Sequence, residues 1–234
     1  MKERVIFNKE KKVAFLKDFP AIHGFSTIKA GNMSYRWGSR EIVNQNLNNL
    51  YQMLTLDVTK EVHIMPEFGP TVMIVTEANQ GETLRCDGLL TTVDNIPLGL
   101  CPADCLPIVL TTDDLQFVGL VHGGKENLIE YKIVERTIKK IQESLNIPSR
   151  EILVGIGPGI GRCHYEYDLY LLAVDQLRRT KIPEDNIWIA GICTYCSKFP
   201  GEDSYIFFSH RRSQTTGEEE GRFAAIVALN PKKH

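Results

Sequence analysis

The sequence lacks the features of a membrane-spanning or secreted protein. None of its apolar runs approaches the roughly 20 residues that a helix needs to cross a bilayer, and its first residues lack the apolar core of a signal peptide. The formal net charge is only -2, which gives no overall attraction to nucleic acid or to a membrane surface. We therefore expect a cytoplasmic protein, with a monomer favoured, whose partner is a small molecule.

Cysteine is too sparse to hold the fold together. Six cysteines in 234 residues do not make the dense disulfide framework of a small secreted domain, so free thiols are available for metal binding or for chemistry. The segment Cys193-Thr194-Tyr195-Cys196 has redox-motif spacing. It lacks the strand–helix–strand context of a redox enzyme and a second pair for structural zinc, and we interpret it as two buried thiols.

Repeats, low-complexity tracts and linkers are also absent. With 43% hydrophobic and 24% charged residues, the composition is that of an ordinary globular chain, and residues 1–234 are predicted to form one domain. Apolar runs bounded by turn residues, and apolar residues at helical spacing, predict mixed strands and helices. The strands are expected at residues 21–26, 72–75, 88–92, 106–110, 117–121, 151–156, 187–192 and 223–229, and the helices at 41–54, 127–145 and 169–179. This mixture predicts an α/β or α+β fold in layers, with the strand directions left open.

Three separated residues sit at the edges of such apolar runs. They are His63 in Glu-Val-His-Ile, Cys105 in Pro-Ala-Asp-Cys-Leu-Pro, and His122 in Gly-Leu-Val-His-Gly-Gly. A shared sheet would bring two imidazoles and one thiolate to one point, which is the ligand set of an open zinc site with a fourth position for water or substrate. The sequence therefore predicts a metal-centred enzyme with Zn²⁺ on these three residues.

Two motifs near these residues carry weaker signals. Asp104 precedes the cysteine, and its carboxylate is expected either to orient a ligand histidine or to hold a buried turn. The glycine-rich stretch at residues 155–161 does not match the Gly-x-Gly-x-x-Gly spacing of a dinucleotide loop, and Pro158 stands where a helix should open. We interpret this stretch as a tight structural turn.

Short motifs follow one another in a recognisable order along nearly the whole chain. They are His-Gly-Phe-Ser-Thr at 23–27, Asp-Gly-Leu-Leu-Thr at 87–91, Ala-Asp-Cys-Leu-Pro at 103–107, Gly-Leu-Val-His-Gly-Gly at 119–124, Ile-Gly-Pro-Gly-Ile-Gly-Arg-Cys at 156–163, Phe-Ser-His-Arg-Arg at 208–212 and Gly-Arg-Phe-Ala at 221–224. This series resembles the laccase-domain family, also called YfiH-like or polyphenol oxidase. The resemblance implies layered sheets flanked by helices, in a fold related to a cysteine-hydrolase-like group. It also implies a zinc ion on His63, Cys105 and His122, and purine nucleoside phosphorylase activity with accompanying adenosine deaminase activity.

The chain departs from the family pattern in the segments around these ligands. The usual Gln-Val-His-Gly reads Glu-Val-His-Ile at 61–64. Two arginines of the pattern are missing, at Ile28 and after His122, where Lys125 keeps one positive charge without replacing the planar fork that binds an oxyanion in two places. The usual Cys-Cys-Tyr-Glu reads Cys163-His164-Tyr165-Glu166, which adds a candidate ligand or base.

Phosphorolysis of a nucleoside needs an anion-binding corner for phosphate and a proton donor for the departing base. Candidates for the first task are Lys125, Arg211, Arg212 and Arg222, whose alternative is a solvated surface role, and candidates for the second are His164 and His210. The His-x-Glu and Pro-Cys-x-x-Cys signature of nucleobase deaminases is absent, so deamination would use another geometry.

Two other functions remain open on the same residues. The chain can be a hydrolase in which Cys105 is a thiolate nucleophile and His122 its base. It can also be a degenerate member that binds a nucleoside without turnover, because the missing arginines weaken phosphate binding.

Overall fold

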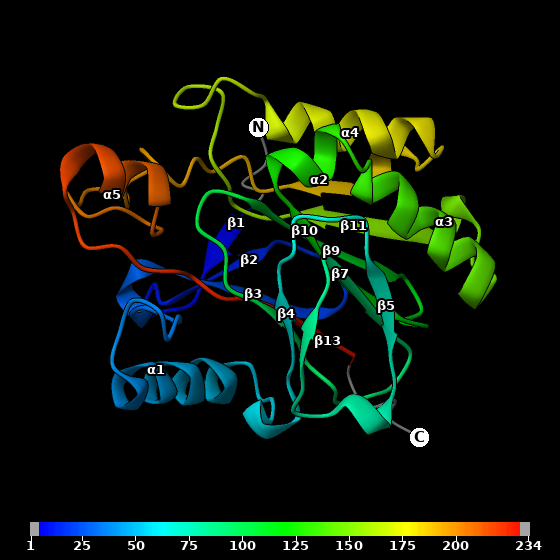
Figure 1. Ribbon diagram of the computed structural model, residues 1–234, viewed down its shortest axis with the longest axis horizontal. Coiled ribbons are helices and arrows are strands. Elements are labelled where there is room, and N and C mark those ends of the chain that lie inside the picture. The colour runs from blue at the N-terminus through cyan, green and yellow to red at the C-terminus, as the bar shows by residue number, and fades with distance from the viewer. Residues whose placement is uncertain (1–4, 230–234) are drawn as a thin grey trace.

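Two mixed β-sheets lie face to face in the computed structural model, which describes residues 5–229 (Figure 1). The first sheet has the order β1 (Val5–Phe7), β2 (Val13–Leu16), β3 (Ile22–Ser26), β13 (Ala225–Ala228), β8 (Leu98–Leu100), β4 (Val62–Met65), β6 (Thr83–Arg85). The second has the order β12 (Ile187–Ile189), β11 (Ile152–Ile156), β9 (Leu106–Thr112), β10 (Val118–Gly123), β7 (Gly88–Thr91), β5 (Val72–Val75). Both sheets combine parallel and antiparallel pairs, which confirms the layered mixed fold predicted from the sequence.

Alternating side chains divide the core into layers. On β10, Val118 and Leu120 pack with residues of the first sheet, whereas Val121 packs under the helices on the other face, as the two-residue period of a strand requires. The helices α2 (Lys125–Ile129), α3 (Ile133–Leu145) and α4 (Leu169–Arg179) cover that outer face, and α1 (Arg40–Met53) covers the opposite face of the first sheet (Figure 1). The order of layers is therefore helix, sheet, sheet, helix.

The long helix predicted at residues 127–145 is wrong in one respect, because the chain forms two helices there. Helix α2 ends at Ile129 and α3 begins at Ile133, after Lys132 adopts a left-handed conformation with φ 51° and ψ 49°. The buried Gln176 of α4 satisfies both new helix ends, since its amide donates to the Leu128 carbonyl at 2.8 Å and accepts from the Val134 N–H at 3.1 Å. A partner 42 residues away along the chain thus fixes a break that local spacing does not reveal.

Most of the remaining predicted elements lie near their expected positions, but the strand predicted at 187–192 ends at Ile189 and the helix at 210–216 was not predicted. Helices α1 and α4 lie within one residue of their predicted ranges. Helix α5 (His210–Thr216) and 3₁₀ turns at Ile28–Ala30, Val58–Lys60, Glu77–Asn79, Ser149–Glu151 and Glu184–Asn186 complete the structure. Within residues 5–229, no helix is long and apolar enough to cross a membrane.

Candidate active site

Cys105 and His122 meet at one end of the β9–β10 pair. Strand β9 begins directly after Cys105, and His122 lies opposite Pro107 in the antiparallel register. A Cβ atom placed on Gly124 would lie 3.4 Å from Cys105 Sγ and 3.2 Å from His122 Cε1, so both side chains border this glycine. The sheet therefore joins two of the three predicted zinc ligands.

A buried carboxylate orients the His122 imidazole. Asp87 immediately precedes β7, the strand next to β10, and its side chain is fully buried. His122 Nδ1 donates to Asp87 Oδ1 at 2.9 Å, and the N–H groups of Phe68 and Gly69 donate to the two carboxylate oxygens at 3.2 and 2.8 Å. With Nδ1 held in this way, Nε2 is the nitrogen left for a metal or for proton transfer, which is the usual arrangement of a ligand histidine.

The charges around His122 favour its protonated form. Burial lowers the pKa of this imidazole, but negative charge on Cys105 and the hydrogen bond to Asp87 outweigh burial and raise the pKa to about 9. Burial would raise the pKa of Asp87, yet the hydrogen bonds from His122 and Gly69 hold it below its ordinary value. The three side chains thus form an ordered acid–imidazole–thiol series.

His63 lies on the other sheet, where β4 pairs with β8. Its Nδ1 donates to Glu61 Oε1 at 2.7 Å, which leaves Nε2 available as in His122. It lines a neighbouring cavity of about 740 Å³ together with Glu61 and Cys101. The donor atoms of His63, Cys105 and His122 do not all lie within 4.8 Å of one another in the described structure, so the third predicted ligand is oriented but not assembled with the other two.

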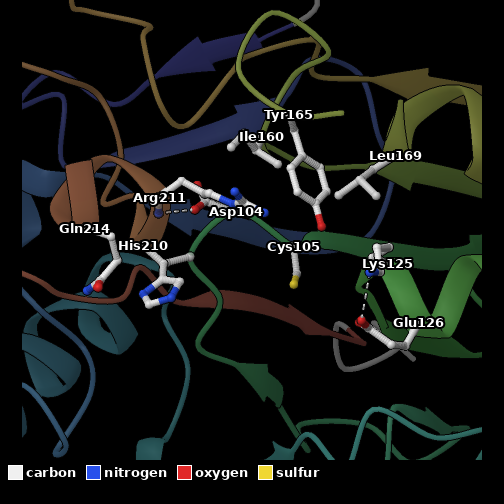
Figure 2. A pocket seen from close by; sticks show the side chains of 11 residues that line it. Asp104, Cys105, Lys125, Glu126, Ile160, Tyr165, Leu169, His210, Arg211 and Gln214 are labelled. Carbon is white, nitrogen blue, oxygen red and sulfur yellow. Dashed lines mark hydrogen bonds and ion pairs between the residues drawn. The ribbon is translucent and has the colours of Figure 1, made fainter. Parts of the chain in front are cut away.

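A cavity of about 550 Å³ opens beside Cys105. It is lined by Ala103, Asp104, Cys105, Lys125, Glu126, Ile160, Tyr165, Leu169, His210, Arg211 and Gln214. Figure 2 shows Lys125 and Arg211 on opposite sides of the cysteine, with the Tyr165 ring above it. The volume lies within the usual range for small-molecule sites.

The two cations of this cavity are held differently. Arg211 lies over the Tyr165 ring, with its guanidinium carbon 4.6 Å from the ring centroid, and it has no ion-pair partner within residues 5–229. Lys125 lies 3.5 Å from the Glu126 carboxylate and 5.3 Å from the centroid of the Tyr167 ring. Arg211 is therefore the cation with spare hydrogen-bond donors for an incoming anion.

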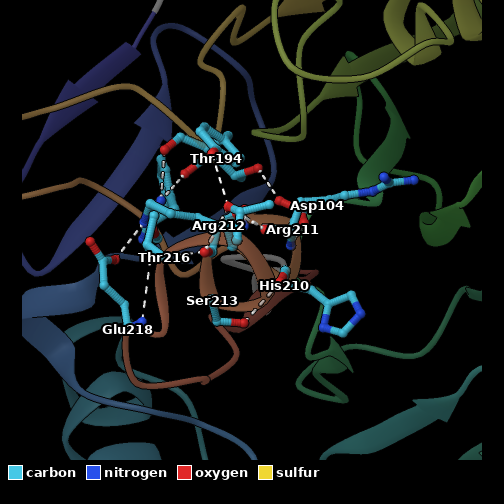
Figure 3. Close-up of polar contacts among 12 residues, drawn as sticks. Asp104, Thr194, His210, Arg211, Arg212, Ser213, Thr216 and Glu218 are labelled. Atoms are coloured by element: carbon cyan, nitrogen blue, oxygen red, sulfur yellow. Dashed lines mark hydrogen bonds and ion pairs between the residues drawn. The ribbon is translucent and has the colours of Figure 1, made fainter.

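Arg212 is not in the cavity, although the sequence predicted it beside Arg211. Its guanidinium is buried and donates to the carbonyls of Thr194, Tyr195 and Phe207 at 2.7 to 2.9 Å and to Glu218 Oε2 at 2.7 Å (Figure 3). These bonds occupy the fork that phosphate would need. Arg212 thus ties α5 to the segment at 194–195, and we do not assign it to phosphate binding.

Three other predicted residues lie at different places. His210 lines the cavity and donates through Nδ1 to Glu220 Oε1 at 2.6 Å. Arg222 bonds to the same carboxylate oxygen at 2.9 Å but does not line this cavity. His164 stacks on Tyr195 with ring centroids 4.1 Å apart and belongs to a separate cluster of cysteines.

Asp104 serves the turn rather than a histidine, which settles an open prediction. Its carboxylate accepts from the Thr194 hydroxyl at 2.7 Å and from the Arg211 N–H at 2.8 Å. The residue has φ of 85°, a conformation that costs energy for a side chain other than glycine. The bonds to Thr194 and Arg211 hold this turn in the geometry that presents Cys105.

Sequence analysis did not assign Asp87, Glu61 or Tyr165 to the site. Asp87 stands inside a motif of the ordered series, Tyr165 follows the motif at 156–163 by two residues, and Glu61 stands two residues before His63. These positions were the available signal, but only the pairing of β7 with β10 shows which imidazole Asp87 contacts.

The structure has helix–sheet–sheet–helix layers, with a thiol and a carboxylate-held imidazole at a strand end. This combination also occurs in a known class of proteins, the laccase-domain family. The chain matches the family described as multi-copper polyphenol oxidoreductase laccase over residues 22–168 and 164–230, and it belongs to this family. Among solved structures, YlmD from Geobacillus stearothermophilus superposes with a TM-score of 0.87 at 24% identity, over 97% of this chain and 100% of that one. The hypothetical protein YfiH of Bacillus licheniformis gives 0.85 at 19% identity, over 97% and 99%. The YfiH-like fold is therefore confirmed.

Several curated relatives carry the name purine nucleoside phosphorylase, and two of them show how much of the chain is matched. The protein from Clostridium acetobutylicum is 27% identical and covers 87% of this chain and 89% of its own length. The protein from Xylella fastidiosa is 28% identical, with 91% and 89% covered. The similarity spans nearly the whole length of both relatives, which agrees with the single series of motifs.

Proposed function

We propose that this chain is a purine nucleoside phosphorylase that converts adenosine or inosine to the free base and ribose 1-phosphate in the cavity beside Cys105. The observation that carries the proposal is the cavity itself, which places an unpaired arginine, a lysine and a carboxylate-held histidine around one thiol. The names of the relatives support the choice of substrate. The cavity volume is sufficient for a nucleoside together with phosphate.

Arg211 is the proposed phosphate-binding residue. Its guanidinium is planar and offers paired donors that suit two phosphate oxygens at once. The Tyr165 ring beneath it restricts its position, and its backbone is fixed by the bond to Asp104. Lys125 adds a second positive charge from the opposite wall (Figure 2). Arg211 stands in the Phe-Ser-His-Arg-Arg motif that this chain shares with the family, whereas the two missing arginines of the pattern fall at Ile28 and Glu126.

His210 is the proposed proton donor to the departing purine. Its Nδ1 is held by Glu220, so the imidazole keeps a fixed orientation with Nε2 free to hold or transfer a proton. Hydrogen bonds from His210 and Arg222 keep the pKa of Glu220 below its ordinary value although burial opposes this. The ionised Glu220 carboxylate thus holds the His210 ring in place through its hydrogen bond.

The chemistry of three donors at and beside this cavity fits a zinc ion, with His63, Cys105 and His122 as the proposed ligands. Both histidines have Nδ1 bound by a carboxylate and Nε2 left over, which is the pattern of metal-binding imidazoles. Assembly requires the partly exposed His63 side chain to turn toward the other two. A bound zinc ion would supply a Lewis acid that polarises oxygen next to the thiol.

The test is direct incubation of purified, zinc-loaded protein with inosine or adenosine, with and without phosphate, followed by chromatography of base and sugar phosphate. We expect hypoxanthine or adenine with ribose 1-phosphate only when phosphate is present, and loss of product in Cys105→Ala. Inosine formed from adenosine would add the deaminase activity. Release of no base above the Cys105→Ala control by folded, metal-containing protein would reject the proposal.

A second function rests on the order Asp87, His122, Cys105. An acid that holds an imidazole next to a thiol is the arrangement of a cysteine nucleophile with its general base. A hydrolase of this kind would be active after metal removal and would be inactivated by alkylation of Cys105. Activity that requires metal and survives a thiol-directed reagent would exclude it.

A further inference from the structure

A second group of metal-ligating side chains lies outside the candidate active site. We propose that Cys163, His164, Cys193 and Cys196 bind one structural zinc ion. One ligand atom from each lies within 4.8 Å of all the others, and no other such group of three or more is found in residues 5–229. The sequence has no second pair of cysteines at this spacing, because the other half of the group is the adjacent Cys163 and His164.

The spacing of the sulfurs agrees with a tetrahedral centre. A zinc–sulfur bond of about 2.3 Å places two sulfurs of a tetrahedron about 3.8 Å apart. Cys163 Sγ and Cys196 Sγ are 3.8 Å apart. A disulfide would need about 2.05 Å, so the thiols have the separation of shared ligands rather than of bonded atoms.

Backbone pairing builds the site from two loops. Strands β11 and β12 are parallel neighbours, so the loops that follow them leave the sheet on the same side. Gly159 bridges to Cys193, and the Thr194 N–H donates to the Gly159 carbonyl at 3.1 Å. Backbone pairing thus places the Cys163-His164 dipeptide next to the Cys193–Cys196 turn.

A backbone N–H group points at one of the four ligand atoms. The Gly161 N–H donates to Cys193 Sγ at 3.2 Å. A bond of this kind suits a thiolate, the form that a metal ion would bind in place of the thiol proton.

The ligand types select the metal and its role. Three thiolates and one imidazole suit Zn²⁺ and disfavour the hard cations Ca²⁺ and Mg²⁺. Four protein ligands complete the tetrahedron and leave no position for substrate, which is the mark of a structural site. Stacking on Tyr195 fixes the plane of the His164 ring. Cys163, His164 and Cys196 are exposed, so an ion can enter from solvent.

The site would stabilise one wall of the active-site cavity. Tyr165, which lines the cavity under Arg211, directly follows the two ligands at 163–164. Thr194, between the other two ligands, donates to Asp104 at the cysteine turn. The proposed zinc would therefore hold the loop of Tyr165 and the support of Asp104 together.

The test counts metal by elemental analysis in reduced, zinc-loaded full-length protein. We expect Cys163→Ser with Cys196→Ser to lose about one equivalent per chain relative to the unaltered protein. Cys105→Ser should keep the equivalent of zinc bound at Cys163 and Cys196. Absence of zinc from the proposed active site is therefore measured separately from absence of the structural zinc. Cys101→Ser, a thiol outside both groups that donates to the Met33 carbonyl, is the matched control and should lose nothing.

Cobalt provides a second, spectroscopic readout. The unaltered protein loaded with Co²⁺ should show the strong thiolate-to-cobalt charge-transfer absorption of a site with three thiolates, and His164→Asn should alter it while the protein stays folded by circular dichroism. Equal metal content in the double variant and the unaltered protein would overturn the proposal. Thiol counting and peptide mass spectrometry would also overturn it if they showed a Cys163–Cys196 disulfide in the isolated protein and the reduced protein then bound no metal.

Discussion

Replacing Asp87 by asparagine tests whether the buried carboxylate organises the site. Both of its oxygens accept hydrogen bonds from N–H groups, Oδ1 from His122 and Phe68 and Oδ2 from Gly69. An asparagine has one oxygen and one NH₂ group. Whichever way the amide is turned, its NH₂ faces at least one N–H donor, and that donor is left without an acceptor in the protein interior.

The magnitude follows from these lost bonds. A hydrogen bond to a charged group contributes about 1.5–3 kcal/mol, and a buried donor without a partner costs about 1–3 kcal/mol. Asp87→Asn should therefore lower the free energy of unfolding by about 3 kcal/mol or more. In a chain of this size each kcal/mol shifts the melting temperature by about 2–4 °C, so we expect a fall of about 6 °C or more. The affinity of the proposed site at His122 for zinc should also fall, by about 10- to 100-fold.

Asp104→Asn is the matched control, because it changes a second buried carboxylate by the same atom. The partners of Asp104 are the Thr194 hydroxyl and the Arg211 N–H. A hydroxyl can reverse its role and accept from the new NH₂ group, while the amide oxygen keeps the bond from Arg211. The expected cost is about 1 kcal/mol. Urea unfolding and thermal melts that give the two variants equal losses would refute the argument from hydrogen-bond matching.

Three further outcomes are expected. Arg211→Gln should raise KM for phosphate by about 10- to 100-fold, the equivalent of about 1.5–3 kcal/mol, while Arg222→Gln changes it little; equal effects in steady-state kinetics would contradict the assignment. Burial holds the pKa of His23 below its ordinary 6.5, so as pH falls the unfolded chain takes up a proton at this histidine before the folded chain does. The contribution of neutral His23 to stability is therefore complete above pH 6.5 and is lost as pH falls below that value. Urea midpoints compared at about pH 7.5 and about pH 5 should show this loss, and a smaller one in His23→Gln. Phe207→Ala, at a fully buried ring, should cost about 3–5 kcal/mol, whereas Ile42→Ala, at a side chain 57% exposed, should stay within about 0.5 kcal/mol; similar costs in urea titrations would argue against the described core.

The sequence predicts the elements of this fold better than the contacts of its site. Apolar patterns locate the strands β9 and β10, and so they place Cys105 and His122 at element ends. Patterns do not place His63 relative to them, because that residue lies in the other sheet and sheet packing leaves no local signal. Whether His63 can join Cys105 and His122 at one metal ion thus depends on how the two sheets pack against each other.

Adjacent residues show a second limit. Arg211 and Arg212 are identical in type, but neighbours on a helix point about 100° apart. One lies over Tyr165 at the cavity, and the other is buried under α5. Similarly, the interpretation of Cys193 and Cys196 as two buried thiols is correct for the first and wrong for the second, which is exposed. Burial depends on the tertiary position of each helix and turn, and the spacing of residues does not contain it.

The position of β13 has a consequence for the order in which the molecule assembles. This strand, Ala225–Ala228, is the only link between the β1–β2–β3 ribbon and the strands β8, β4 and β6 in the described sheet. The six strands of the second sheet all come from residues 72–189 and can associate earlier. The ribbon at residues 5–26 must wait for a partner about 200 positions downstream, and closing so large a loop is slow. We expect the last step of folding to be the insertion of β13 between β3 and β8. Until then the edge of β3 has unpaired backbone groups and can pair with strands of other molecules.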